Sequence, residues 1–331
     1  MPARRGSQTV RAGGLTPTRG CYGAGMRIVG IFAAVVLSFA PLHAHADTAK
    51  AWTAAKAGLP AEAKIVIGVD FAALQKTQLF TALYAKLVEK AEVTKVLDTM
   101  KSTCKIDPLA AVQGVVIAQS ADQQDGAIYL ALAGVDRTKL SSCLQTAIQG
   151  MDDKTAKVSL KQDGNITQVI TEGKDPQFFG WVGKDVVVVS PHAKDKAAIL
   201  KWMTGKGALA KTDVGKFLSK VNTSAAVWGA AEATKELEPG ITAKGGYGVV
   251  AFVKGNADAD VHAVMGDATQ AASMATAAKK QIDDAKGQLP PPLDALVKAV
   301  TIAAAKDEVI LKGSFLEKDL LGAVALALGA S

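Results

Sequence analysis

The chain has 331 residues, of which 49% are hydrophobic, and it contains 38 basic and 31 acidic side chains. This apolar content excludes an intrinsically disordered chain, and the length allows one large domain or two of typical size. Five of the basic residues are arginines within residues 1–46, where no acidic residue occurs, which leaves 33 basic against 31 acidic groups in the rest of the chain. These nearly equal numbers of basic and acidic groups exclude the strongly basic face of a nucleic-acid-binding domain.

Residues 26–46 have the pattern of a secretory signal peptide. Arg27 provides the positive charge, residues 28–39 form an almost unbroken apolar run, and a small-x-small motif ends at Ala46. We therefore expect cleavage between Ala46 and Asp47. The apolar run is shorter than the roughly 20 residues that a membrane-spanning helix needs, so the sequence predicts a periplasmic or secreted protein with no permanent transmembrane helix.

Residues 1–25 precede this signal and show no hydrophobic periodicity. We interpret them as an incorrectly assigned leader and Met26 as the initiator. Two alternatives stay open: a long positively charged region, or a twin-arginine signal at Arg4 and Arg5, although the apolar core begins more than twenty residues after that pair. Cys21 follows no apolar segment with a lipobox, so a lipid anchor is not expected.

After a lead-in at residues 47–61, the pattern predicts an N-terminal half over residues 62–203. Apolar residues at helical spacing indicate a long helix over 80–91, and alternating β-branched residues indicate strands. In chain order we expect a strand at 64–69, that helix, a second helical segment at 96–104, a hairpin of 115–118 and 127–133, a helix at 140–148, strands at 158–161, 167–171, 178–182 and 186–189, and a short helix over 190–203.

A Gly- and Lys-rich segment at residues 204–213 marks the expected boundary of a C-terminal half over 213–331. There we expect a helix at 214–221, strands at 225–230, 247–253 and 261–265, a long helix capped by Asp267, a helix at 293–305, a strand at 309–315 and a helix at 318–328. Both halves alternate helices with meandering strands. The predicted class is therefore α+β, with antiparallel sheets covered by helices on one face and two possibly related halves.

After signal cleavage only two cysteines remain, Cys104 and Cys143. An even pair in an oxidising compartment predicts a disulfide, and the helical pattern around Cys143 places that thiol on an inward face. Closing a loop of about 40 residues stabilises a fold by roughly 3–4 kcal/mol in the chain-entropy model. The alternative is two buried free thiols.

Three segments resemble a group of uncharacterised secreted proteins of Gram-negative bacteria. They are V-D-F-x-x-L-x-x-T-Q-L-F at 69–80, C-K-I-D-P-L-A-A-V-Q-G-V-V-I-A at 104–118 and A-G-V-D-R-T-K-L-S-S-C-L at 133–144. The shared Cys-x-Ile-Asp-Pro motif comprises Cys104, Ile106, Asp107 and Pro108, and Cys143 lies in the third segment. The resemblance covers residues 62–150, implies no established activity and supports the pairing of the two cysteines.

The sequence assigns no catalytic, cofactor-binding or metal-binding residue. His192 follows a strand at a turn, and His262 alternates with apolar neighbours, so we expect the first in a solvated turn and the second on an exposed sheet face. Asn256, Asp258, Asp260 and Asp267 match part of a calcium-loop spacing, but Val261 stands where the required glycine would be. We interpret this segment as a polar hairpin turn. Neither a Gly-x-Ser-x-Gly elbow nor a His-Glu-x-x-His motif occurs.

Three functions stay open at this point. The first is a non-catalytic protein that binds or scaffolds an unknown partner or ligand in the cell envelope. The second is a carrier of an apolar ligand, and the third is a hydrolase-type enzyme with a dispersed site of carboxylate, Lys or Ser side chains. The side chains that line the site discriminate among them: convergent carboxylates favour the enzyme, a large apolar cavity favours the carrier, and neither favours the scaffold.

Overall fold

The structure of the chain is a computed structural model that describes residues 48–151, 157–172, 175–191, 193–238 and 240–327. The predicted leader, the signal peptide and its cleavage site between Ala46 and Asp47 lie outside these residues. His192 lies outside them as well.

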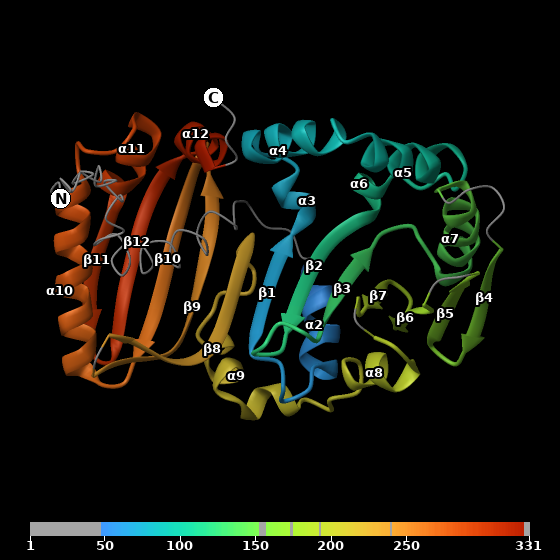
Figure 1. Cartoon of the computed structure of the whole chain (residues 1–331), viewed down its shortest axis with the longest axis horizontal. Helices are drawn as coiled ribbons and strands as arrows, with labels where there is room; N and C mark the ends of the chain where they lie inside the picture. Colours follow the sequence, from blue (N-terminus) through green and yellow to red (C-terminus); the bar gives the residue numbers. More distant parts are fainter. Residues whose placement is uncertain (1–47, 152–156, 173–174, 192, 239, 328–331) are drawn as a thin grey trace, which may run out of the picture.

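The strands form one sheet of twelve, in the order β11-β12-β10-β9-β8-β1-β2-β3-β7-β6-β5-β4 (Figure 1). Every pair of neighbours is antiparallel, which confirms the predicted α+β class with meandering antiparallel strands. The strands are β1 (Ile65–Asp70), β2 (Val112–Gln119), β3 (Gly126–Leu132), β4 (Val158–Asp163), β5 (Ile166–Thr171), β6 (Gln177–Val182), β7 (Val186–Val189), β8 (Val227–Glu238), β9 (Ile241–Val253), β10 (Asn256–Met265), β11 (Val300–Ala305) and β12 (Glu308–Leu316).

Helices connect these strands at the ends and across the faces of the sheet (Figure 1). They are α2 (Thr48–Gly58), α3 (Phe71–Leu74), α4 (Gln78–Val88), α5 (Ala91–Ser102), α6 (Pro108–Ala111), α7 (Arg137–Met151), α8 (Lys196–Lys201), the 3₁₀ helix η1 (Ala208–Lys211), α9 (Asp213–Leu218), α10 (Ala268–Ala285), α11 (Pro291–Ala299) and α12 (Glu317–Ala327). Among the described residues, no helix combines the length and the apolar content that crossing a membrane requires.

The N-terminal strands are covered on both faces, which differs from the expected single covered face. Val186 and Val188 of β7 belong to a core with α2, α9 and the end of α8, whereas Val187 belongs to a second core with α6 and α7. Because successive residues of a strand point to opposite faces, these cores lie on opposite sides of the sheet. The strands here are therefore apolar on both faces.

The C-terminal strands follow the expected arrangement, since α10, α11 and α12 pack on the same face of β10. Ala263 and Met265 contact α10, and Ala257 and Ala259 belong to the core that includes Leu320 of α12. These four residues are separated by even numbers of positions along the strand, so they share one face. The opposite face presents polar side chains of β10 and β12, which form the cluster described below.

The two predicted halves share the sheet without a break, because β1 pairs with β8. Gly68 lies opposite Trp228 in this pair, and a β-carbon at Gly68 would collide with the Trp228 ring. That ring packs edge-on against Trp52 of α2 at 4.8 Å. At the other end of the strands, the buried Glu317 side chain accepts hydrogen bonds from the backbone of Gln78 (2.9 Å) and Leu79 (3.4 Å). Whether the halves arose by duplication stays a prediction.

Three predicted elements differ from the structure. Residues 300–305 were expected to continue a helix, but they form β11, because pairing with β12 along their whole length overrides the helix propensity of three alanines. Residues 256–260 were expected in a turn, but they lie in β10, and the turn is formed by Lys254 and Gly255. The long helix predicted over 80–91 ends at Val88, and a new helix starts at Ala91.

Candidate functional site

An apolar pocket lies between the helices α5, α6 and α7 and the face of strands β3, β5, β6 and β7. Its volume is about 270 Å³. Gln177, which is exposed, is the one polar residue among those that line it. The apolar lining residues are Met100, Ile106, Pro108, Ala111, Val112, Leu130, Leu132, Val135, Leu140, Val169, Phe178, Phe179, Val187 and Val189.

The floor of the pocket consists of strand residues that point away from the central core. Leu130 and Leu132 of β3 and Val187 and Val189 of β7 alternate with residues buried on the other face. Period-two alternation therefore provides two apolar surfaces from the same strands, one for the core and one for the pocket. Apolar residues at both alternating positions are typical of strands with both faces covered.

The roof of the pocket is formed by the end of α5, the short α6 and the first turns of α7. Asp107 accepts a hydrogen bond from the backbone of Leu109 (3.1 Å), and Pro108 occupies the first turn of α6, so the Asp-Pro pair fixes where this helix begins. The helix directs Ala111 inward, while its neighbour Ala110 is exposed. The Ile106, Asp107 and Pro108 of the sequence motif therefore shape the roof.

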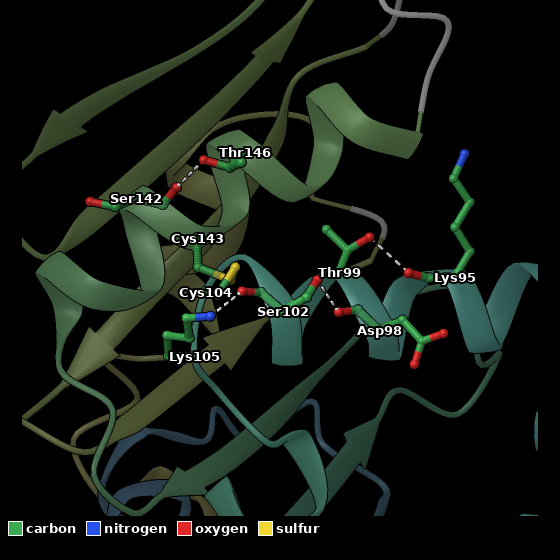
Figure 2. The surroundings of a disulfide bond; sticks show 9 residues. All are labelled: Lys95, Asp98, Thr99, Ser102, Cys104, Lys105, Ser142, Cys143 and Thr146. Atoms are coloured by element: carbon green, nitrogen blue, oxygen red, sulfur yellow. Dashed lines mark hydrogen bonds between the residues drawn. A yellow bond between two sulfur atoms is a disulfide. The ribbon is translucent and has the colours of Figure 1, made fainter.

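The disulfide between Cys104 and Cys143 closes this roof. The bond joins the segment after α5 to the middle of α7, with the two α-carbons 4.9 Å apart (Figure 2). Cys143 is buried, as its helical pattern predicts. Met100 and Ile106 precede and follow Cys104 in the pocket wall, and Leu140 lies one turn before Cys143. The predicted disulfide is thus present in the structure and ties two walls of the pocket together.

Helix α5 depends on this link more than its neighbours do. None of the α5 side chains that the structure describes is buried, and the two hydroxyl groups of Thr99 and Ser102 bond to carbonyls of their own helix (Figure 2). The helix contacts α4, α6 and α7. The partly buried Met100 packs against the second core, and the disulfide adds a covalent attachment to α7.

A second group of interacting side chains lies on the opposite, polar face of the C-terminal strands. We call it the His262 cluster: Tyr247, Asp260, His262, Glu308, Lys220 and Lys312. Nδ1 of His262 lies 2.8 Å from Glu308, and its Nε2 lies 3.1 Å from Asp260. Lys220 pairs with Glu308 at 2.7 Å, and Lys312 pairs with Asp260 at 2.9 Å. The Tyr247 ring stacks on the His262 ring at 4.5 Å.

The charges of the His262 cluster balance one another, because two carboxylates pair with two lysines. Partial burial raises the pKa of Glu308, but hydrogen bonds from Lys220, His262 and Tyr247 outweigh it and the pKa is lowered. Partial burial and the bond to Glu308 raise the pKa of Tyr247. Nδ1 of His262 and both oxygens of Glu308 have hydrogen-bond partners, whereas Nε2 of His262 lies 3.1 Å from a buried Asp260 oxygen that accepts no hydrogen bond. Because these paired charges come from three strands and the segment after α9, the arrangement is suited to stabilising the sheet.

The structure separates the residues that the sequence singled out. His262 lies on the polar sheet face that the alternation predicts, but its side chain is 19% exposed instead of open to solvent, because Tyr247 stacks on its ring. Its two carboxylate partners come from different strands. Asn256, Asp258 and Asp260 follow one strand instead of encircling an ion, and Asp267 caps α10. Within the described ranges, no group of three or more His, Cys, Asp or Glu side chains has the geometry to hold a metal ion.

Comparison with known proteins gives little further guidance. No protein-family model matches the chain, and no curated protein matches it. Among solved structures, crystal form III of TP0453 is similar, with a TM-score of 0.49 and 9% identity over 82% of this chain and 97% of that chain. Crystal form IV of the same protein gives a TM-score of 0.46 and 10% identity over 82% and 96%. A global similarity at this level assigns neither function nor partner.

Sequence reasoning did not find the apolar pocket. Its lining residues come from eight helices and strands and the loops between them, and each apolar one has the ordinary pattern of a core residue. The sequence does indicate that a second layer covers β3 and β7, because both strands have apolar residues on both faces. A pattern cannot show whether that layer fills the space completely, since a cavity depends on side-chain volumes contributed by distant segments.

Proposed function

We propose that this protein is exported to the cell envelope or secreted and there binds a small apolar ligand in the pocket between α5, α6, α7 and the sheet. The pocket lining is the observation that supports the proposal, because Gln177 at the rim is its one polar residue. Ligand pockets are typically concave and mostly apolar, with few polar groups. Of the three functions open from sequence, the carrier requires a large apolar cavity, and this pocket has the apolar lining but a small volume.

Volume and chemistry narrow the ligand class. A cavity of about 270 Å³ is slightly below the range of roughly 300–1,000 Å³ that drug-sized ligands occupy. With so little polar lining, a buried hydroxyl, amide or charge would lose its hydrogen bonds to water without replacement. The pocket therefore suits a compact hydrocarbon group, such as a small ring system or the end of an aliphatic chain.

The enzyme alternative has weaker support. Asp260 and Glu308 converge on His262, but Lys312 and Lys220 neutralise them. The proposed envelope location depends on the signal peptide pattern, and the disulfide is consistent with an oxidising compartment. The resemblance to secreted Gram-negative proteins agrees with this location.

The test is to isolate the protein without detergent from the envelope of its own host, extract it with organic solvent and analyse the extract by mass spectrometry. We expect an apolar compound that is retained by the wild type and by Ala110→Leu but lost by Ala111→Leu. Both substitutions add the same side chain to α6, but only residue 111 faces the pocket. An extract in which the wild type and both variants hold the same compounds contradicts the proposal.

A further inference from the structure

The disulfide lies close to residues of the pocket wall on both of its sides. Cys104 is located between Met100 and Ile106, which both line the pocket, and Leu140, three residues before Cys143, lines it as well. The bond therefore joins two segments of the wall, the one that follows α5 and the middle of α7. No other cysteine remains in the chain after the predicted signal cleavage, so the bridge is the one redox-active group of the exported protein.

The chain reverses direction directly after Cys104. The backbone of Lys105 is left-handed, with a φ of 54°, and the amide of Ile106 donates a hydrogen bond to the carbonyl of Met100 (3.1 Å). This turn buries the Ile106 side chain to 3% exposure in the pocket wall. Because Met100 and Ile106 are held together across the turn, a movement of Cys104 changes two residues of the wall at once.

Few apolar contacts hold this segment in place on the α5 side. None of the described α5 side chains is buried, and Met100 is only partly buried against the second core. Regions with few buried apolar contacts open locally at low free energy. Without the bond, the end of α5 can therefore separate from α7 at a low cost in free energy, and this separation opens the pocket to water.

We propose that the bridge between Cys104 and Cys143 regulates the pocket, so that the oxidised chain retains its apolar ligand and the reduced chain releases it. This inference rests on the proposed function and adds a redox dependence to it. The physical reason is the hydrophobic effect. When the roof opens, water reaches the ligand and the apolar wall, and the free energy gained by burying them is lost.

The reaction is thiol–disulfide exchange with a dithiol reductant. A thiolate of the reductant attacks the Cys104 sulfur, Cys143 leaves as a thiolate that takes up a proton, and the second thiol of the reductant then frees Cys104. The two cysteines gain two electrons and two protons, and the reductant becomes a disulfide. Cys104 is the accessible sulfur, since it is partly exposed whereas Cys143 is buried. The exposed Lys105 beside it attracts a negatively charged thiolate.

Titration with the uncharged fluorophore N-phenyl-1-naphthylamine, before and after treatment with dithiothreitol, tests the inference. We expect the reduced wild type to bind the fluorophore at least about tenfold more weakly than the oxidised wild type, and re-oxidation to restore the affinity. The double variant Cys104→Ser with Cys143→Ser is the control for the reductant. It should bind weakly, and to the same extent with and without dithiothreitol. Circular dichroism checks that the reduced chain and the variant are folded.

The outcomes separate this inference from the proposed function. Saturable binding that is equally tight in the oxidised and in the reduced, folded chain leaves the proposed function standing and overturns the redox dependence. A reduced chain that unfolds as a whole overturns it as well, because release would then not result from local opening of the roof. No saturable binding to the oxidised wild type contradicts the proposed function and, with it, this inference.

Discussion

At the scale of single residues, Glu308 connects more groups than any other carboxylate described above. Its oxygens bind Lys220, His262 and Tyr247, which come from the α9 region, β10 and β9. Its side chain is 14% exposed, so water replaces these partners poorly. Removing such a largely covered, paired carboxylate costs more free energy than removing an exposed one.

Replacing Glu308 with glutamine keeps the shape but removes the charge. We expect the free energy of unfolding at neutral pH to fall by about 1–3 kcal/mol, because charge-assisted hydrogen bonds are lost and Lys220 loses its counter-ion. Glu89→Gln is the control, since Glu89 forms an exposed pair with Lys86 and should change stability by less than about 0.5 kcal/mol. Urea unfolding of both variants measures the difference, and equal effects would count against the role given to Glu308.

The pKa of Glu308 also predicts how the stability of the protein depends on pH. The pKa of Glu308 is lowered from its ordinary value of 4.5 in the folded protein. A carboxyl whose folded pKa is lowered stabilises the fold above its unfolded pKa, and this contribution is lost as the pH falls through the folded pKa. The stability difference between wild type and Glu308→Gln should therefore shrink as the pH falls below 4.5. A difference that stays the same or grows below pH 4.5 would contradict this assignment.

At the scale of elements, α5 is the part of the pocket roof with the weakest packing. The structure shows no buried α5 side chain among those described, and the disulfide to α7 follows its last turn. Regions with few buried apolar contacts open locally at low free energy. The covalent link therefore has a local role as well as a global one.

Removing both cysteines, as Cys104→Ser with Cys143→Ser, should destabilise the protein by roughly 3–4 kcal/mol for a loop of this length. Relative to the wild type, amide exchange in this variant should accelerate more in α5 than in β9, which is an interior strand of the C-terminal half. Hydrogen exchange with mass spectrometry gives both values. Uniform acceleration across the whole sheet would show that the bridge has no special effect on the roof.

Much of the element pattern could be predicted from the sequence. The strands β1 to β7 and the helices α7 and α10 follow from β-branched runs and from helical periodicity or capping, as at Asp267. Residues 300–305 could not be predicted as a strand, because three consecutive alanines favour a helix until β12 pairs with them. The sequence also does not predict that Leu83 and Leu87 of α4 are 40% and 46% exposed, because helical periodicity does not show what an apolar face packs against.

At the scale of the whole molecule, one sheet spans both halves, and the strands β3, β7, β6 and β5, which line the pocket, lie toward the opposite end of it from β11 (Figure 1). The pair β1–β8 and the Glu317 cap on α4 join these ends. The proposed ligand binding can therefore be tested with substitutions that leave the C-terminal strands unchanged.

The predicted export concerns the whole chain and has its own test. Because the cleavage motif ends at Ala46, protein recovered from the envelope or the medium should begin at Asp47. Amino-terminal sequencing of that material checks the prediction. Recovery of a cytoplasmic protein with residues 1–25 intact would contradict both the cleavage site and the assignment of Met26 as the start.

The central claim is that the pocket beneath α5, α6 and α7 binds apolar ligands, and the most direct measurement is equilibrium titration with the uncharged fluorophore N-phenyl-1-naphthylamine. We predict saturable binding of one fluorophore per chain to the wild type and to Ala110→Leu, and at least about tenfold weaker binding to Ala111→Leu, whose side chain enters the cavity. Thermal unfolding confirms that both variants are folded. Equal affinity of a folded Ala111→Leu, or no saturable binding to the wild type, would contradict the claim.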